Sequence, residues 1–420
     1  MRTLIVSDLH LGGLTGIDLL RRPGLRASLL GELQDVDRLV LLGDVLELRH
    51  GPPHEALGAA RPFFEDLGRA LGERELIVSA GNHDHLLVST WLDARALHAP
   101  GPLELEHRIG PAEASPALAQ IAEWIRPARV EMAYPGVWVR PDVYAMHGHY
   151  LDCHLTIPTL ERLGIGAMGR LLERPVSALD TVEGYEAVTS PIYAWRDVMA
   201  RYARTGPALN GVATVRAWRA LGGGRGVSAA DARRAAGTGP PGPSSSRAGG
   251  AVNGALAANM DGSAGESVGR GRGRLVREVR ASLRTRALKS GFPLAVSAFN
   301  RAGLGPVSPD ISGGELRRAG LRAMGEVAAR LGLGDTYVIF GHTHRAGPFS
   351  GDVESEWRGR TGARLVNSGC WTYDSVFVTA TPGESPYWPG TCVLVEDSGP
   401  PVLKRLLLDR SSAELRPLPA

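Results

Sequence analysis

Five short motifs in this chain concentrate carboxylate, imidazole and amide side chains, which are the groups that hold divalent metal ions. They are Asp8-Leu9-His10, Gly43-Asp44-Val45-Leu46-Glu47, Gly81-Asn82-His83-Asp84, His147-Gly148-His149 and Gly341-His342-Thr343-His344. Each motif alone is short enough to occur by chance, but together they supply mixed oxygen and nitrogen ligands without a thiolate. Such ligands suit Mn²⁺, Fe or Zn²⁺ in five- or six-fold coordination better than a tetrahedral structural zinc.

A phosphate ester is the substrate class for which such a ligand set is most useful. Negative oxygens shield the phosphorus atom, so an attacking hydroxide needs both charge neutralisation and activation. Two divalent cations about 3.5–4 Å apart polarise the phosphate and lower the pKa of a bound water. One carboxylate has to bridge cations this close, and Asp44 is the candidate. The remaining ligands divide into Asp8 and His10 on one cation, Asn82 and His147 on the other, and one imidazole each from His342 and His344.

An apolar run precedes each motif and predicts a buried strand. These runs cover residues 4–6, 39–42, 76–78, 143–146 and 337–340. Side chains just beyond the carboxyl ends of strands converge on one edge of a sheet, where open α/β folds bind ligands. Short turns that contain glycine then let the backbone pass close to the metals. The spacing therefore predicts an α/β fold with all five motifs at one edge of its sheet.

The motif set resembles the calcineurin-like metallophosphoesterase superfamily, whose pattern is D-x-H, G-D-x-x-[DE], G-N-H-[DE], a later His and G-H-x-H. The resemblance covers residues 1 to about 150 and about 335 to 408, and Asn367-Ser368-Gly369 resembles the family's Asn-x-Gly turn. It implies a metal-dependent phosphoric ester hydrolase with a β-sandwich flanked by helices, in four layers α/β/β/α. By this resemblance the first metal binds Asp8, His10, Asp44 and His344, and the second binds Asp44, Asn82, His147 and His342.

The resemblance also implies three catalytic residues that are not metal ligands. His83 would face the phosphate and protonate the leaving oxygen, and Glu47 stands where the family has an acid that orients this histidine. Asp84 would stabilise the turn that carries them. An imidazole beside two cations resists protonation unless a carboxylate compensates, so a nearby Glu47 or Asp84 fits this role. The alternative is that His83 only packs the loop.

Two further residues are candidates for binding substrate. His149 could contact a substrate phosphate at the rim of the site, or it could satisfy hydrogen bonds within its own loop. Arg345 follows the last motif directly and could clamp a phosphate oxygen, with an ordinary surface arginine as the alternative reading.

A long insertion separates His147 from His342. We expect a discontinuous catalytic domain, residues 1–154 and 332–410, with a helical cap insertion at 155–331. Helical patterns appear at 191–202 and 315–331, while the Gly-, Ser-, Pro- and Arg-rich stretch of about 222–273 predicts a disordered loop. Superfamily members that hydrolyse UDP-diacylglucosamine also carry a helical cap here. They have Arg at the position of His83 and Asp at that of His149, so their substrate is not transferred to this chain.

The segment 270–289 is strongly basic, with eight Arg or Lys residues against the single acid Glu278. One hypothesis is an interfacial helix that contacts an anionic membrane and brings a membrane-borne phosphate ester to the site. A second is attraction of a phosphate-rich or nucleic-acid substrate. The third is a solvated cap helix without a binding role.

Composition limits the remaining possibilities. A chain of 420 residues exceeds a usual single core. Its formal net charge of +3 is too small to imply nucleic acid by itself, and we expect no nucleic-acid partner. Three cysteines without disulfide or zinc spacing indicate a reducing compartment. The chain starts directly with an expected strand and has no apolar stretch of about 20 residues. We therefore expect a cytoplasmic protein, with peripheral contact at the inner membrane face as an extension of the basic-segment hypothesis.

The sequence thus predicts a phosphoesterase with two divalent cations, Mn²⁺ first and Fe or Zn²⁺ as alternatives. A pyrophosphatase or phosphodiesterase that binds a lipid-linked or nucleotide-linked substrate under the cap is the main alternative. A nuclease would need an aromatic and basic groove, and a non-catalytic scaffold would usually have lost ligands. The sequence leaves the substrate, the class of phosphate ester and the oligomeric state open.

Overall fold

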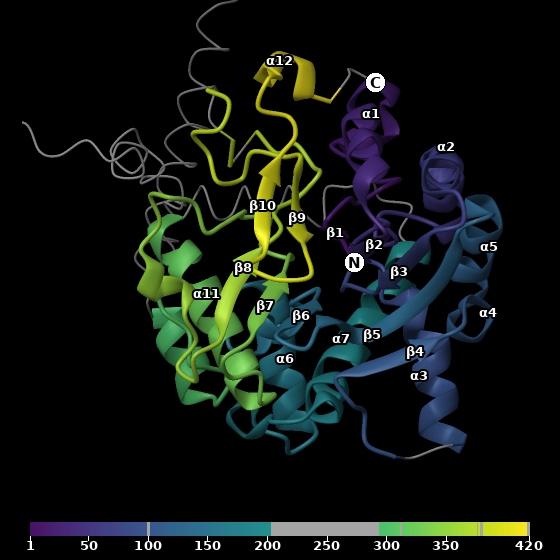
Figure 1. Cartoon of the computed structure of the whole chain (residues 1–420). Coiled ribbons are helices and arrows are strands. Elements are labelled where there is room, and N and C mark those ends of the chain that lie inside the picture. The colour runs from purple at the N-terminus through teal and green to yellow at the C-terminus, as the bar shows by residue number, and fades with distance from the viewer. Residues whose placement is uncertain (99–100, 203–293, 311–312, 376, 379–380, 418–420) are drawn as a thin grey trace, which may run out of the picture.

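The computed structural model describes residues 1–98, 101–202, 294–310, 313–375, 377–378 and 381–417 (Figure 1). These residues form a mixed α/β fold in which helices flank a large curled sheet, so the α/β prediction is confirmed. The strands are β1 (Thr3–Val6), β2 (Arg38–Leu42), β3 (Glu75–Ser79), β4 (Glu106–Ile109), β5 (Arg129–Arg140), β6 (Val143–Met146), β7 (Tyr337–Phe340), β8 (Arg364–Asn367), β9 (Thr391–Val395) and β10 (Val402–Arg405). All five predicted strands are present, two of them with the predicted bounds.

The long strand β5 joins two halves of the sheet. The strand order is β10-β9-β1-β2-β3-β5-β6-β7-β8, and β4 pairs with β5 off this path. The first part of β5 runs parallel to β3 from Arg129 to Met132, while Gly136 to Arg140 pairs antiparallel with β6. Strands β1–β3 are parallel to one another, and so are β6–β8. The sheet therefore has two mostly parallel halves that share one strand.

Alternating apolar side chains divide the strands between an inner and two outer cores. Successive residues of a strand point to opposite faces of its sheet. Ile5 and Val40 from one half therefore meet Val143 and Ile339 from the other half in one buried cluster. The neighbouring residues, such as Leu4, face outward into a second cluster. The two halves of the sheet thus enclose an apolar layer between them.

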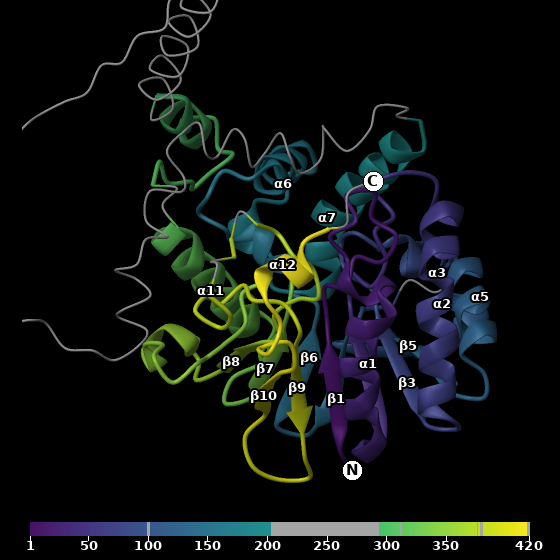
Figure 2. The ribbon, with the colours of Figure 1, turned by 90° about the horizontal axis from the view of Figure 1, so that it is seen from above.

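Helices cover both outer faces of the sheet. They are α1 (Pro23–Glu32), α2 (Pro53–Leu71), α3 (Leu86–His98), α4 (Pro111–Ala114), α5 (Pro116–Ile125), α6 (Leu160–Leu171), α7 (Val182–Tyr202), α11 (Gly313–Arg330) and α12 (Ser412–Leu415), with 3₁₀ turns η1 (Leu19–Arg21), η2 (Leu33–Asp35), η3 (His149–Cys153), η4 (Val176–Ala178) and η6 (Glu354–Trp357). Figure 2 shows α1, α2, α3 and α5 on one side of the sheet and α11 on the other. In α2, Pro53 suits the first turn and Gly72, with φ of 60°, follows its end.

The described part of the expected cap shares its core with the sheet. Side chains of α6, α7 and α11 belong to the same buried cluster as those of β6, β7 and β8. The helix predicted at 191–202 is the second half of the longer α7, and the helix predicted at 315–331 corresponds to α11. The predicted disordered loop at 222–273 and the basic segment 270–289 lie outside the described residues.

Glu186 anchors α7 to the sheet. Its fully buried carboxylate accepts hydrogen bonds from the hydroxyls of Tyr134 in β5 and Tyr150 in η3, and His85 Nε2 lies 3.3 Å from it. Burial alone would raise the pKa of Glu186, but the hydrogen bond and charge of His85 bring it down to about 2. The contact fixes α7 beside the carboxyl ends of the strands.

In the part of the chain that the structure describes, no helix is both long and apolar enough to cross a bilayer.

Candidate metal centre

All five motifs meet at the carboxyl ends of β1, β2, β3, β6 and β7. Asp8 and His10 follow β1, Asp44 and Glu47 follow β2, Asn82, His83 and Asp84 follow β3, His147 follows β6, and His342 and His344 follow β7. Backbone hydrogen bonds link the loops directly, since Asp8 N donates to Gly43 O at 3.1 Å and Gly341 N to His147 O at 3.0 Å. The predicted convergence of the motifs is therefore present.

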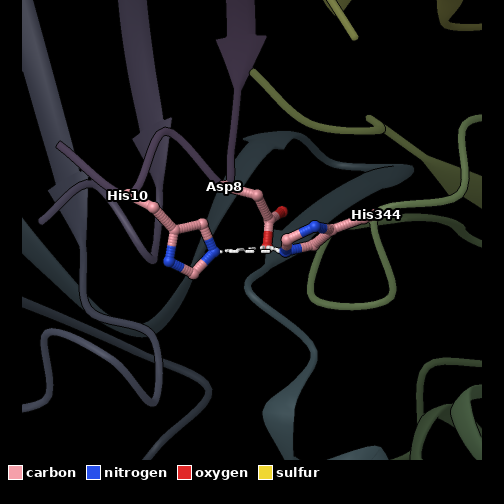
Figure 3. A group of neighbouring side chains, drawn as sticks. All are labelled: Asp8, His10 and His344. Atoms are coloured by element: carbon pink, nitrogen blue, oxygen red, sulfur yellow. Dashed lines mark hydrogen bonds and ion pairs between the residues drawn. The ribbon is translucent and has the colours of Figure 1, made fainter. Parts of the chain in front are cut away.

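Asp8, His10 and His344 form one group of potential metal ligands. The Nε2 atoms of His10 and His344 lie 3.1 Å apart, and His344 Nε2 lies 3.2 Å from Asp8 Oδ1. Figure 3 shows the three side chains pointing toward one another. One ligand atom from each lies within 4.8 Å of the others. Buried His and Asp groups of this kind can hold a metal ion.

Asp44, His147 and His342 form a second group of potential metal ligands. His147 Nε2 lies 3.3 Å from Asp44 Oδ2, and ligand atoms of all three lie within 4.8 Å of one another. The same Asp44 oxygen lies 3.6 Å from His10 Nε2, which belongs to the first group. Asp44 thus lies between the two groups, in the position that a bridging carboxylate requires.

Asn82 provides a test of whether these residues fit a cation. Its side-chain oxygen Oδ1 lies 3.3 Å from His147 Nε2. The same end of the amide is 3.2 Å from Asp44 Oδ2 and 3.1 Å from His342 Nδ1. Turned with its amide nitrogen toward these three groups, Asn82 would donate to all of them, and turned with its oxygen toward them it would complete a set of carboxylate, amide and imidazole ligands. Oxygen and imidazole ligands suit a divalent cation. The donor set therefore fits a metal.

Left-handed backbone is concentrated at the ligands. Positive φ angles occur at Asp8 (55°), His10 (46°), Asp44 (50°), His342 (62°) and His344 (58°). Within the described ranges only two other residues besides glycine have a positive φ, namely Glu173 and Asp335. Such conformations cost about 1–3 kcal/mol each and persist where surrounding structure enforces them, mostly at functional sites. Five of the seven predicted ligand positions therefore have this unfavourable backbone conformation.

Two motif glycines permit the close approach of ligands from other motifs. A Cβ at Gly81 would collide with Asp44 Oδ1, and a Cβ at Gly341 would collide with Asp8 Oδ2. Neither neighbour can move without displacing a ligand. The glycines of one motif are therefore required for the ligand geometry of another.

The electrostatics of the cluster favour positive charge. Burial alone would raise the pKa of Asp44, but the imidazoles of His147 and His83 lower it well below its usual range. Burial opposes protonation of His147, yet the charge and hydrogen bond of Asp44, together with the charges of Asp8 and Asp84, outweigh this effect and raise the pKa of His147 to about 9. The buried carboxylates thus stabilise positive charge on their neighbours, and a divalent cation would satisfy the same negative field.

Glu47 holds two imidazoles with one oxygen. Its Oε2 lies 2.8 Å from His83 Nδ1 and 3.1 Å from His10 Nδ1. Burial, against the opposing charges of Glu47 and Asp44, lowers the pKa of His83 to about 4. Because Nδ1 meets Glu47, Nε2 is the ring nitrogen of His83 that can meet a substrate. The pairing expected between Glu47 and His83 is therefore present, and Glu47 additionally orients a ligand.

Asp84 supports the loops rather than facing the cluster. Its carboxylate accepts hydrogen bonds from the backbone N–H groups of Gly81 at 2.7 Å, Val45 at 2.7 Å, Asp44 at 3.2 Å and Leu46 at 3.3 Å. Burial and the nearby charge of Asp44 raise the pKa of Asp84 to about 6. It fixes the second and third motifs relative to each other.

Sequence reasoning missed Asp152, which orients a ligand. Asp152 is 4% exposed, and its Oδ2 lies 3.0 Å from His342 Nε2, which leaves His342 Nδ1 toward the cluster. Every ligand imidazole has such a partner: Glu47 for His10, the Leu42 carbonyl for His147, Asp152 for His342 and Thr372 for His344. A metal-bound histidine usually donates its other N–H in this way. Because each ligand histidine needs an acceptor for its second ring N–H, a carboxylate such as Asp152 could have been sought as that acceptor.

Asp152→Asn is expected to weaken binding of the metal held by the second group by about 10–100-fold, because the amide no longer fixes the tautomer and ring orientation of His342. Isothermal titration with Mn²⁺ measures this change. Asp397→Asn, at an exposed carboxylate that pairs with the chain's amino terminus, is the matched control and should bind like the parent. Two unchanged affinities in Asp152→Asn would show that its contact with His342 has no orienting role.

The two expected substrate-binding residues lie in different environments. His149 is completely buried behind His147, with its ring 5.7 Å from that of Tyr193, and so it does not lie on the rim. Neither of its ring nitrogens has a hydrogen-bond partner among the described residues, so local loop hydrogen bonds do not account for it either. Arg345 is 7% exposed, which corrects the surface-arginine alternative.

Asn367 fixes the last motif from the neighbouring strand. Its Nδ2 donates to Gly341 O at 3.0 Å and to Thr343 Oγ1 at 2.9 Å, while its Oδ1 accepts from Gly369 N at 2.9 Å. The Asn-x-Gly turn identified in the sequence thus positions the backbone between His342 and His344.

Comparison with known proteins adds no relative to this picture. No protein-family model matches the chain, and no curated protein has a matching sequence.

Proposed function

We propose that this chain is a metal-dependent phosphoric ester hydrolase of the metallophosphoesterase type, which works with two divalent cations. The observation that carries the proposal is the position of Asp44. It lies 3.3 Å from His147 in one ligand group and 3.6 Å from His10 in the other. A carboxylate in that position is what two closely spaced cations require. We propose Mn²⁺ as the working metal, with Fe or Zn²⁺ as alternatives that suit the same ligands.

The arrangement of the sheet supports this proposal. An apolar layer lies between its two halves, and helices cover both outer faces. This supports the four-layer α/β/β/α sandwich that the sequence resemblance implies, with residues 1–154 and 332–410 as the catalytic domain. Fold alone does not determine function, so the ligands remain the main argument.

The cations would neutralise the phosphate and activate the attacking water. His83 is the residue that would supply the proton needed by the leaving oxygen. As the phosphorus–oxygen ester bond breaks, His83 Nε2 gives a proton to the leaving oxygen, and the oxygen of water becomes bonded to phosphorus. Glu47 accepts from Nδ1 throughout and so fixes the ring while Nε2 changes its protonation. A negative phosphate close to the ring favours its protonated form and opposes the effect of burial.

Metal analysis combined with a substrate panel tests the proposal. The full chain, purified and supplied with Mn²⁺, is expected to bind two metal ions and to hydrolyse aryl phosphates, with activity lost in chelator and restored by Mn²⁺. The panel should include monoesters, diesters and pyrophosphate esters, some of them lipid-linked, to assign the ester class. Absence of bound metal together with absence of turnover on every ester would favour a non-catalytic scaffold instead.

A further inference from the structure

A cavity of about 310 Å³ adjoins the two ligand groups, and His342 and His344 form part of its wall. Other lining residues lie in η3, in α11, beside Arg345, and at Thr372, Asp374, Phe377 and Tyr387. This volume is at the lower end of the range of about 300–1,000 Å³ that is usual for small-molecule sites. The cavity can therefore receive a small group attached to a phosphate at the ligands.

Most of the cavity wall is apolar. Its apolar side chains are Ile17, Leu151, Leu155, Leu316, Leu321, Trp357 and Phe377. The polar side chains next to the ligands are already engaged, because Asp152 bonds to His342 and Asn367 bonds to Thr343. A group with several hydroxyls would lose water here without gaining equivalent partners, whereas an apolar group gains free energy on entry.

Arg345 is one of the polar side chains in this wall, which also includes Arg317, Thr372 and Asp374. Its guanidinium lies 4.8 Å from the centre of the Trp357 ring, and its Nη2 donates to Asp352 at 2.7 Å. Nε and Nη1 are buried and have no hydrogen-bond partner among the described residues. Buried N–H groups without an acceptor are costly, so an oxygen of a bound ligand would stabilise this side chain.

We propose that this cavity binds an apolar organic group carried by the substrate phosphate, and that Arg345 donates to an oxygen of the same molecule. The inference rests on the proposed hydrolase function and names its substrate class, a phosphate ester of an apolar alcohol or phenol. Hydrolysis would consume one water, break the phosphorus–oxygen bond and release the alcohol and inorganic phosphate.

Binding of non-hydrolysable alkylphosphonates tests the cavity separately from turnover. Isothermal titration of the Mn²⁺-loaded full chain with methyl-, butyl-, hexyl- and octylphosphonate should show Kd falling by about fourfold per methylene until the cavity is filled. Arg345→Gln should weaken binding of every phosphonate by about tenfold and preserve the dependence on chain length. A Kd that is independent of chain length would overturn the inference.

Leu316→Gln is the variant that addresses the wall itself. Leu316 is half-buried on α11, where glutamine is a good helix former, so the fold should tolerate the change. The ratio of the Kd of methylphosphonate to that of octylphosphonate should be about tenfold smaller in this variant than in the parent. The same substitution at Leu97, which is 77% exposed and outside the cavity, should keep the parental ratio. If the Kd ratio in Leu316→Gln equals that of the parent, the alkyl chain binds outside this cavity.

The proposed cavity and the proposed hydrolase function can be refuted independently, because phosphonate binding tests the first and ester hydrolysis tests the second. Hydrolysis of phenyl phosphate without any dependence of phosphonate binding on chain length would refute the cavity and retain the hydrolase. Binding that depends on chain length, without hydrolysis of any 4-alkylphenyl phosphate, would retain an apolar phosphate-binding site and refute the hydrolase.

Discussion

Asp44→Asn is expected to lower the turnover of an aryl phosphate by about 10³-fold or more and to reduce the bound metal below two ions per chain. Among the described residues, Asp44 is the carboxylate that lies within 3.6 Å of imidazoles from both ligand groups. An amide at this position is neutral, so it cannot offset the repulsion between two divalent cations. The loss should therefore affect metal content and activity together.

Inductively coupled plasma mass spectrometry of dialysed protein gives the metal content, and steady-state kinetics with Mn²⁺ in excess gives the turnover. Asp409→Asn, at an exposed position, is the matched control and should retain both. A thermal unfolding scan separates a folded Asp44→Asn variant from one that has lost its structure. Two tightly bound metals with parental turnover in the folded variant would exclude Asp44 as a bridge.

His83→Ala is expected to lower turnover by about 10²–10⁴-fold while two metals stay bound. The size of the loss should depend on the leaving group. A nitrophenolate leaves without much help from an acid, whereas an alkoxide requires a proton as the bond breaks. The loss should therefore be small for 4-nitrophenyl phosphate and large for an alkyl phosphate.

Turnover of both esters and metal content should be measured in the same preparations. His54→Ala, at an exposed histidine in the first turn of α2, should behave like the parent. An equal loss for both esters would show that His83 does not act as the acid. Loss of a metal ion from His83→Ala would instead place His83 among the ligands, an outcome to consider because it lies within 4.8 Å of ligand atoms of His10 and Asp44.

The local parts of this structure could be predicted because their signals are contained in short segments. Val143–Met146 and Tyr337–Phe340 have the predicted bounds, since each is an apolar run that stops at a motif. The convergence of the motifs followed from the rule that parallel strands place their carboxyl ends at one edge. The bend of the sheet did not follow, because it depends on how β5 pairs with strands on both sides. At Gly136 in this bend, any Cβ would collide with the backbone of Ala145.

The surroundings of the ligands were less predictable than the ligands themselves. Asp152 contacts His342 across 190 positions of sequence, so no local pattern marks it as a partner. The sequence left two readings of His149 open, a substrate contact at the rim and hydrogen bonds within its own loop, but in the structure the rings of Tyr150 and of Tyr193 in α7 pack against it. Burial of this kind is decided by the packing of distant helices, whereas a ligand motif is fixed by its own strand and turn.

The left-handed backbone at five ligand positions creates a conflict between folding and chemistry. Glycine at those positions would remove the steric cost and make the polypeptide easier to fold, yet every such replacement would delete a side chain that the site uses. Selection for heat resistance alone would therefore favour the loss of these five side chains. A requirement for the site as a whole explains why two aspartates and three histidines are retained in a conformation that glycine adopts at lower cost.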